Sequence, residues 1–464
     1  MTRRKQGERT LWEGVVDEDV RALWEPWMVE ADRLLEDEEL VDLVYQAQGE
    51  RHEHSATRGR SQTPAETALR LLLLKHVRNW SFDTLEREVK MNLAYRDFTR
   101  MGLGKVPDAK TLARIAQALG GEVIAKLHDR LVAMAQEEGV VRGRKMRVDT
   151  TVVETNIHYP TDSSLLGDGA RVLTRTMKKI EQKAGGKLKR KVRDRMRSVN
   201  RRTIAIATAS RHRGPEGEEK RKKEYRELLR LSRQILNDTK RVMVEMDQMP
   251  ARRKKGLRSL SDGLSAVSAR MRQVLKQTKA RIFEGLTQLP GKIVSIFEAH
   301  TEIIRKGKAS KPTEFGKLVQ LQEAENQIIT HYDVFDQRPS DRELLQGAVA
   351  THQRILGRIP RLVTADAGYY SQAQERAVEA MGVKWVAVPN RNTHSPEKLE
   401  KSRWFKKAQA WRTGCEGRIS VVKRRHGLRR CLYRGVEGMK RWVGLGVLAD
   451  NLINIGKALV VARA

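Results

Sequence analysis

Residues 146–153, Met-Arg-Val-Asp-Thr-Thr-Val-Val, decide the fold of this chain. Apolar and β-branched residues dominate this short run, which predicts a β-strand that is largely buried. Asp149 interrupts the run, and a carboxylate inside an apolar strand is costly unless it is paired with or binds a cation. The stretch therefore predicts a core strand that carries one functional acid.

Two further acidic residues have equally informative surroundings. Asp366 ends a second apolar run, residues 362–366, just before Ala-Gly-Tyr-Tyr. Glu416 lies in residues 412–425, a segment crowded with Lys and Arg. Carboxylate oxygens are the ligands that Mg²⁺ prefers in proteins. Three such acids in a very basic chain predict a Mg²⁺ site that acts on nucleic acid.

The composition narrows the class of partner. The 464 residues include 91 Lys and Arg against 58 Asp and Glu, which gives a formal net charge of +33. Such a charge favours a polyanion through counterion release, although a basic surface without a partner is the alternative. A hydrophobic content of 39% is enough for a sizeable core. An aromatic content of 5% is low, so stacking on bases is not expected to dominate nucleic-acid binding. The length predicts about two to four domains.

Cysteine usage and hydropathy indicate the compartment. Cys415 and Cys431 form neither a disulfide framework nor a paired zinc motif, which predicts a reduced, cytoplasmic setting. Residues 1–10 lack an apolar signal core. Residues 443–462 are the most apolar long stretch, but they contain Asp450, so a pair of buried helices is favoured over a membrane span.

The first 62 residues are predicted to be an acidic helical arm followed by a loop. Residues 11–50 hold 13 Asp and Glu but 2 Arg, and their apolar residues recur at helical spacing. This arm either covers a basic groove before DNA binds or is simply a solvated acidic face.

Residues 63–140 are predicted to form a helical DNA-binding module. Residues 63–66, Thr-Pro-Ala-Glu, look like a helix start with Thr63 as the N-cap, and Ser81 and Asp108 are expected to begin two more helices. Short helices with polar turns suit a helix-turn-helix-like module, although any small helical bundle has the same pattern.

Residues 171–290 are the most basic part of the chain, with 35 Lys and Arg against 12 Asp and Glu, a net charge of +23. Two apolar series flank Met249-Pro250: Leu228, Ile235, Val242 and Met249 precede it, and Leu257, Leu260, Leu264, Val267, Met271 and Val274 follow. This spacing predicts a coiled-coil-like hairpin in a basic helical insertion at 166–290. The insertion is expected to clamp DNA phosphates or to mediate dimerisation; a solvated spacer is the alternative.

After residue 290 strands and helices mix. The predicted strands are 318–322, 327–335, 362–366 and 383–388, and the predicted helices are 341–356, 372–381 and the region around 416–425. With the strand at 146–153, the order is that of an RNase H-like domain, built from 141–165 and 291–464 and interrupted after its first strand. The fold class is therefore α/β with large all-α parts. Asp149 falls on the first strand, Asp366 at the end of the fourth and Glu416 on the last helix.

Two blocks of this sequence resemble a known family. Residues 149–163, Asp-Thr-Thr-Val-Val-Glu-Thr-Asn-Ile-His-Tyr-Pro-Thr-Asp-Ser, resemble the first-aspartate block of DDE transposases of bacterial insertion sequences, notably the ISNCY-type group. Residues 364–370, Thr-Ala-Asp-Ala-Gly-Tyr-Tyr, resemble their second-aspartate block. The resemblance covers essentially residues 63–460.

The glutamate region resembles the same family with one departure. Such enzymes often carry Tyr-x2-Arg-x3-Glu-x6-Lys, and this chain has Arg412, Glu416 and Lys423 at that spacing. Gln409 stands at the tyrosine position, so the role of that tyrosine is not carried over.

The resemblance implies a transposase in which Asp149, Asp366 and Glu416 are the catalytic residues and hold Mg²⁺, two ions in all, with Mn²⁺ as a substitute. Its partner would be double-stranded DNA, both the terminal repeats of the element and the target. A homodimer on paired ends is expected, in the cytoplasm at the nucleoid and away from membranes. The predicted DNA-binding residues are Arg412, Lys423, Arg418, Arg424 and Asn156.

Several alternatives remain open at this point. Asp366 would serve as a simple helix cap, or Glu416 as the surface partner of Arg412 or Lys423. Rival metal ligands are Glu154, Asp162, Asp333 and Asp336. Two functions of other classes compete with an active transposase: a structure-specific RNase H-like nuclease, and a catalytically idle DNA-binding derivative.

Overall fold

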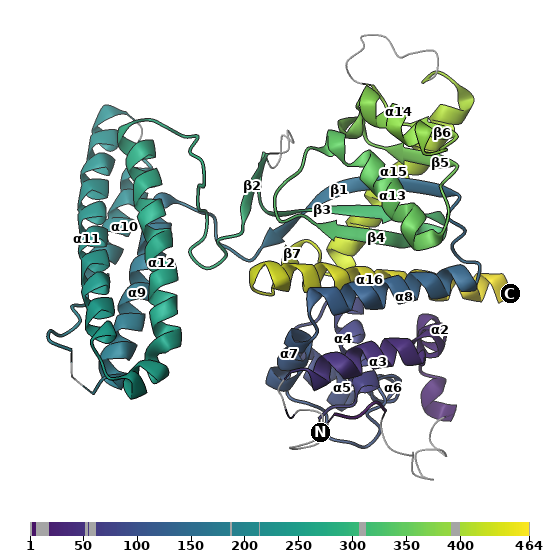
Figure 1. The fold of residues 1–464 in the computed structure, drawn as a ribbon, viewed down its shortest axis with the longest axis horizontal. Helices are drawn as coiled ribbons and strands as arrows, with labels where there is room; N and C mark the ends of the chain where they lie inside the picture. The colour runs from purple at the N-terminus through teal and green to yellow at the C-terminus, as the bar shows by residue number, and fades with distance from the viewer. Residues whose placement is uncertain are drawn as a thin grey trace. The chain divides into compact units, whose positions relative to one another are not determined.

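The computed structural model of the chain describes residues 2–5, 18–51, 54, 62–185, 188–212, 214–305, 312–390 and 400–463, without the side chains of 252–255 and 463. The chain divides into two compact units (Figure 1). We call residues 157–303 the helical unit, and residues 1–156 together with 304–464 the sheet unit.

Within the described residues, seven strands form one mixed sheet. The strands are β1 (Lys145–Thr155), β2 (Glu302–Arg305), β3 (Thr313–Glu323), β4 (Ile329–Val334), β5 (Leu362–Ala365), β6 (Trp385–Ala387) and β7 (Arg430–Cys431). The order is β2-β3-β1-β5-β6, while β4 pairs with β3 and β7 with β1. β1 runs antiparallel to β3 but parallel to β5, and β5 runs parallel to β6. β1 therefore lies in the middle of the sheet, as its apolar sequence requires.

The predicted strands are all present, with ends that differ by a few residues. β2 and β7 were not predicted, because they are only four and two residues long. The helix that carries Glu416 is longer than expected: α15 spans Arg403–Arg425. It is also not the last helix, since α16 (Gly435–Arg463) follows it, which corrects the predicted element order.

Helices cover both faces of the sheet because successive side chains of β1 point to opposite sides. Met146 and Val148 pack in one apolar cluster with α13 (Leu345–Leu356) and α14 (Gln372–Ala380). Val153, on the other face, packs with residues of α15 and α16. Figure 1 shows α16 running beside α8 (Gly121–Glu137) along the sheet.

The apolar C-terminal stretch is a single helix, so the predicted helix pair is wrong. α16 is long and apolar enough to cross a membrane, with a mean hydropathy of 1.5, but 61% of its apolar window is buried inside the protein. Its polar residues are paired in the interior: Asp450 accepts a hydrogen bond from Arg418 at 2.7 Å, and Asn451 accepts one from the Ile329 amide at 2.9 Å. These features are typical of a core helix.

The N-terminal helices belong to the sheet unit. They are α2 (Pro26–Leu35), α3 (Glu38–Gly49), α4 (Ala65–Val77), α5 (Phe82–Met91), α6 (Leu93–Phe98) and α7 (Ala109–Ala118). Ser81 and Asp108 cap α5 and α7 as predicted, accepting hydrogen bonds from the amides of Thr84 at 3.0 Å and Thr111 at 2.8 Å.

The predicted cap at Thr63 is wrong. Pro64 is the N-cap of α4, which has no side-chain cap, and Glu66 pairs with Arg70 at 3.0 Å instead. Arg70 is fully buried, so its charge requires carboxylate partners, and Asp32 of the acidic arm is the second one. Part of the arm's negative charge therefore stabilises the core of the N-terminal helices.

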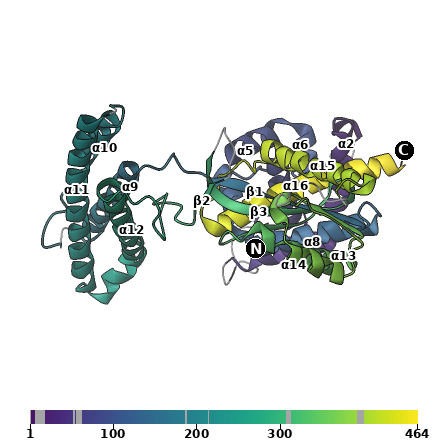
Figure 2. The same cartoon turned by 90° about the horizontal axis from the view of Figure 1, so that it is seen from above.

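The described residues of the helical unit contain four helices, which lie side by side in Figure 2: α9 (Asp162–Lys183), α10 (Met196–Ala209), α11 (Pro215–Asp247) and α12 (Ala251–Phe283). The turn at Met249-Pro250 joins α11 to α12, as predicted. Residues of both predicted apolar series are buried, but α9 and α10 contribute to the same core. The hairpin is thus confirmed as part of a four-helix core, whereas a two-helix coiled coil is not.

Candidate active site

The strand register brings Asp149 and Asp366 to neighbouring positions, just past the point where the parallel pairing of β1 with β5 ends. Val148 of β1 pairs with Ala365 of β5 in a parallel ladder, and each acid is the next residue along its chain. Asp149 remains in β1, whereas Asp366 follows the last residue of β5 and begins a short 3₁₀ turn at 367–369. The two predicted acids are therefore neighbours because of the sheet, although 217 positions separate them in the sequence.

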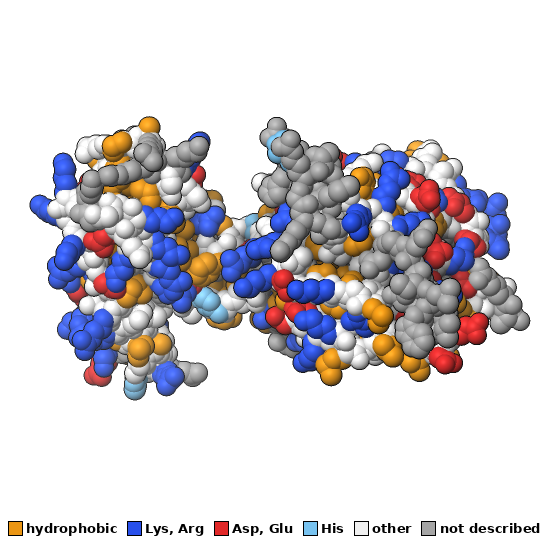
Figure 3. Space-filling view, turned by 90° about the horizontal axis from the view of Figure 1, so that it is seen from below, with side chains coloured by type: hydrophobic (Ala, Val, Ile, Leu, Met, Phe, Trp, Pro, Cys, Tyr) orange, Lys and Arg blue, Asp and Glu red, His pale blue; other side chains and the backbone are white. Residues whose placement is uncertain are grey.

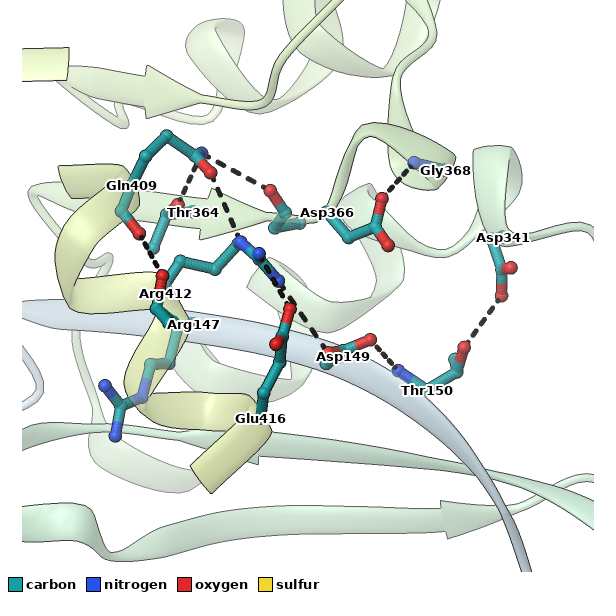
Figure 4. A network of polar contacts seen from close by, with 12 residues as sticks. Arg147, Asp149, Thr150, Asp341, Thr364, Asp366, Gly368, Gln409, Arg412 and Glu416 are labelled. Atoms are coloured by element: carbon teal, nitrogen blue, oxygen red, sulfur yellow. Dashed lines mark hydrogen bonds and ion pairs between the residues drawn. The ribbon is translucent and has the colours of Figure 1, made fainter. Parts of the chain in front are cut away.

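Glu416 reaches this region from α15, which packs against β1 and β5. Arg412, one turn earlier, joins two of the three acids (Figure 4). Its Nη2 donates a hydrogen bond to Glu416 Oε1 at 2.9 Å, and its Nη1 lies 3.9 Å from Asp149 Oδ2. The side chains of Arg412 and Asp149 are 16% and 14% exposed, while Glu416 is 59% exposed. One largely buried guanidinium thus occupies the space between two acids.

Gln409 holds Arg412 from the other side. The Arg412 Nε donates to Gln409 Oε1 at 3.2 Å. The Gln409 amide nitrogen donates in turn to the Ala387 carbonyl at 2.6 Å and to Thr364 Oγ1 at 3.1 Å. Gln409 therefore ties α15 to the ends of β5 and β6, a role that its amide group, with both a donor and an acceptor, can fill.

Backbone amides hold the two aspartates. Asp366 Oδ1 accepts a hydrogen bond from the Gly368 amide at 2.6 Å, so the capping alternative for Asp366 is realised here. Asp149 Oδ1 accepts from the Thr150 amide at 2.7 Å. Each contact engages one carboxylate oxygen and orients the side chain.

Asp341 is a fourth acid at this site that sequence reasoning missed. Thr150 Oγ1 donates to Asp341 Oδ1 at 3.3 Å. An ideal Cβ on Gly368 would lie 3.6 Å from Asp366 Oδ1 and 3.9 Å from Asp341 Oδ2, so these two carboxylates flank the same glycine. Asp341 starts a 3₁₀ turn before α13. An acid at a helix start is ordinary, so no local signal marked it.

Two titratable groups near the acids, Tyr369 and Cys415, have raised pKa values. Burial raises the pKa of Tyr369 well above its usual value, and the charges of Asp149 and Asp341 raise it further. Burial likewise raises the pKa of the Cys415 thiol, with added contributions from Glu323 and Asp149. Both groups therefore stay protonated and neutral near neutral pH.

A buried ion pair fixes α15 against β1 beneath the acids. Arg147 pairs with Glu323 of β3 and donates to the Trp411 carbonyl of α15, and the two ionic side chains are 5% and 1% exposed. Its guanidinium also lies 4.8 Å from the centre of the Trp411 ring. A Cβ on Gly414 would approach Arg147 Nη1 to 2.5 Å, so a larger residue at 414 would displace the Arg147 guanidinium.

Two parts of the chain match family models of known proteins. A family model described as "Transposase domain (DUF772)" matches residues 26–118, and one described as "Transposase DDE domain" matches residues 379–455. Both matches support a DDE transposase of an insertion sequence. No curated protein and no solved structure matched it.

The two matches cover different parts of the transposase. The second includes Glu416 and the whole of α15, while Asp149 and Asp366 lie outside it. The first runs across the boundary predicted between the acidic arm and the helical module at residue 62, so this family domain includes α2 and α3.

The acids of the transposase site have the right donor atoms for a divalent cation, but they do not surround a common position. In the described part of the chain, no three His, Cys, Asp or Glu side chains are placed to hold a metal ion. The oxygen ligands of Asp149, Asp341, Asp366 and Glu416 are nevertheless those that Mg²⁺ binds. A cation also lies between two of them already, as the Arg412 guanidinium. The oxygen donors present therefore fit Mg²⁺ in chemistry.

The predicted DNA-binding residues of the transposase differ in their placement. Arg424 is exposed near the end of α15, and Asn156 is exposed just after β1. Lys423 is half-buried and lies two helical turns beyond Glu416, on the same face of α15. Arg418 is placed differently: it is buried and pairs with Asp450 at 2.7 Å. Because its guanidinium is ion-paired in the core, Arg418 is not proposed as a DNA-binding residue.

The rival ligands lie in other environments. Glu154 is 3.3 Å from Arg430, and Asp336 is 3.6 Å from Lys440. Asp162 pairs with Arg281 inside the helical unit. Burial raises the pKa of Asp333, and Asp336 adds to that effect. Glu154, Asp336 and Asp162 thus each have a cationic partner apart from the acids described above.

Proposed function

We propose that this transposase is catalytically active: it binds the ends of an insertion sequence, cleaves the DNA there and joins the freed 3′-hydroxyl ends to target DNA. The observation that carries the proposal is the placement of Asp149 and Asp366 side by side where the parallel pairing of β1 with β5 ends, with Glu416 on the helix that packs against both strands. Carboxylates in such a position suit phosphoryl transfer on DNA.

The strand arrangement supports an RNase H-like catalytic domain. β4, β3 and β1 are antiparallel neighbours, and β5 and β6 continue the sheet in parallel with β1. In this proposal, residues 141–165 and 291–464 form the catalytic domain, and the basic helices at 166–290 are inserted into it. The helical module at 63–140 binds DNA.

Asp149, Asp366 and Glu416, with Asp341 as a fourth acid, would hold Mg²⁺ or Mn²⁺, two ions in the full site. Bound metal supplies Lewis-acid stabilisation of the phosphate charge and favours deprotonation of the attacking hydroxyl. The protein contributes preorganisation, because backbone amides hold the carboxylates of Asp149 and Asp366 before substrate arrives.

The proposed reaction has two steps, hydrolysis and strand transfer. In the first, water attacks the phosphorus at the end of the element, and the bond to the 3′ oxygen breaks, which leaves a 3′-hydroxyl and a 5′-phosphate. In the second, this 3′-hydroxyl attacks a target phosphodiester and releases a target 3′-hydroxyl. We propose that a homodimer in the cytoplasm, at the nucleoid, holds two ends together so that both are joined.

DNA phosphates are the proposed ligands of the basic surfaces. Lys423 and Arg424 lie beyond Glu416 on α15, Arg412 contacts two of the acids, and Asn156 follows the end of β1. Lys and Arg side chains are spread over the face of the helical unit that Figure 3 shows, in line with the net charge of +23 over residues 171–290. The side chains of the Arg-Arg-Lys-Lys cluster at 252–255 lie outside the described residues.

Cleavage is expected to require Mg²⁺ or Mn²⁺. Ca²⁺ should support DNA binding without cutting, since it is larger and holds its ligands less rigidly than Mg²⁺. The measurement is cleavage of labelled end DNA in each metal and in excess chelator, with a gel-shift assay run in parallel. Full cleavage in excess chelator would remove the metal site from the proposal.

Asp341→Asn is expected to slow cleavage by about 10–100-fold, because it removes one of the acids next to Asp366 and Thr150. Glu343→Gln is the matched control, since Glu343 is an exposed acid of the same 3₁₀ turn. Equal rates for the two variants would mean that Asp341 only shapes the loop.

One reaction separates the proposal from its competitors. Protein, Mg²⁺, labelled end DNA and a target plasmid are incubated together, and the products are separated by size. Joined products indicate a transposase, cut ends without joining indicate a nuclease, and shifted but intact DNA indicates an idle DNA-binding derivative.

A further inference from the structure

Arg412 has an incomplete set of partners at the acidic site. Its Nη2 and Nε donate to Glu416 and Gln409. Its Nη1 is buried, makes no hydrogen bond and lies 3.9 Å from Asp149 Oδ2. A buried donor without a hydrogen bond is unfavourable, so only electrostatic attraction to Asp149 holds this end of the guanidinium. The contact is therefore suited to being exchanged for a better one.

We propose that Arg412 is an internal cation that closes the acidic site in the free protein, and that it leaves when a divalent metal ion binds. The proposal rests on the proposed function, because the metal site is part of it. It adds that the free transposase binds metal weakly and that its own arginine is the reason.

Arg412 and a divalent ion exclude one another for two reasons. Both need oxygens of Asp149 and Glu416, which the guanidinium already contacts. Both are cations, and like charges a few ångströms apart repel strongly in a partly buried site. Mg²⁺ also demands near-ideal geometry, which a planar guanidinium between two of its ligands prevents.

The displaced arginine can then bind DNA. The guanidinium fork matches a phosphate as well as it matches a carboxylate. A phosphate next to the acids would attract Arg412 away from Asp149 and open that site to metal. DNA and metal would thus each raise the affinity for the other, as coupled ligands must. The free protein stays inactive because Arg412 remains in contact with the acids until this exchange takes place.

Gln409 is the positioning residue for this arginine. It holds the Arg412 Nε at 3.2 Å, while its own amide nitrogen donates to the Ala387 carbonyl at 2.6 Å. Gln409→Leu removes this anchor and keeps all charges at the site. We expect it to shift metal affinity in the same direction as loss of Arg412, by a smaller factor.

The experiment is a Mn²⁺ titration of the full chain without DNA, followed by the electron paramagnetic resonance signal of free Mn²⁺. Arg412→Gln is expected to bind Mn²⁺ at least about tenfold more tightly than wild type, and Arg412→Lys by an intermediate factor, because lysine lacks the fork. Arg425→Gln is the matched control: it removes the same charge from an exposed position of α15, about 13 Å beyond Glu416 along the helix axis. Its Mn²⁺ affinity should equal that of wild type. Near-ultraviolet circular dichroism verifies that each variant is folded, and Arg412→Lys serves if Arg412→Gln does not fold.

Adding Asp149→Asn distinguishes failure of this proposal from failure of the metal site. If Asp149→Asn weakens Mn²⁺ binding but Arg412→Gln and Arg412→Lys leave it unchanged, the site stands and the role of Arg412 is overturned. If Asp149→Asn does not weaken Mn²⁺ binding even in the Arg412→Gln background, the metal site itself fails. A short end duplex gives a second readout: it should raise Mn²⁺ affinity in wild type and have little effect in Arg412→Gln.

Discussion

Asp149→Asn, Asp366→Asn and Glu416→Gln are each expected to abolish DNA cleavage, with a loss of at least about 10³-fold, while DNA binding stays within a few-fold of wild type. Each substitution keeps the size of the side chain and removes the negative charge that a Mg²⁺ ligand requires. Loss of cutting with intact binding would therefore locate the defect in chemistry rather than in folding or recognition. The rate is measured on labelled end DNA, and binding by gel shift.

Asp336→Asn is the matched control for these three variants. Asp336 is an acid of the same sheet unit, but its side chain is 69% exposed and lies 3.6 Å from Lys440. We expect its cleavage rate to equal that of wild type. Cleavage near the wild-type rate by Asp149→Asn, Asp366→Asn or Glu416→Gln would exclude that residue from the metal site.

Arg147→Met is expected to lower the free energy of unfolding by about 4 kcal/mol at pH 8, because it leaves Glu323 buried without its cation. Burial already raises the pKa of Glu323. An acid whose pKa is raised by folding costs stability when ionised, so that cost disappears as falling pH protonates it. The variant should therefore regain part of its stability between pH 8 and pH 5.

Urea unfolding at the two pH values measures this effect. The double variant Arg147→Met with Glu323→Leu should recover most of the loss at pH 8, since an apolar pair can replace a buried ion pair. Restored stability with a slower cleavage rate would show that Arg147 also positions α15. A double variant as unstable as Arg147→Met alone would mean that the packing around Trp411 and Gly414, rather than the charge of Glu323, causes the loss.

The sequence contained enough to place the aspartates on their elements. A single acid within residues 146–153 marked a buried strand, and Asp366 stood where an apolar run gave way to a Gly-containing turn. That β1 and β5 are neighbours, and that Val148 pairs with Ala365, depends on packing over the whole sheet. No local pattern specifies that partner choice.

The α15 arginines show why the charge pattern was not sufficient. Arg412 and Arg418 look alike in a basic segment, but six residues rotate a side chain by about 240° around a helix. Arg412 therefore faces Asp149, whereas Arg418 faces Asp450 in the core. Asp341 was missed for a related reason, since its partners, Thr150 and the Gly368 turn, come from other elements.

The central claim, that this chain joins DNA ends through Asp149, Asp366 and Glu416, is tested most directly by sequencing the products of one reaction. A labelled end duplex with a free 3′-hydroxyl is incubated with a target plasmid, Mg²⁺ and either wild-type protein or Asp366→Asn. We predict junctions between the 3′ end of the duplex and the plasmid with wild type, and none with Asp366→Asn. Wild-type reactions without junctions, or junctions made equally well by Asp366→Asn, would contradict the claim.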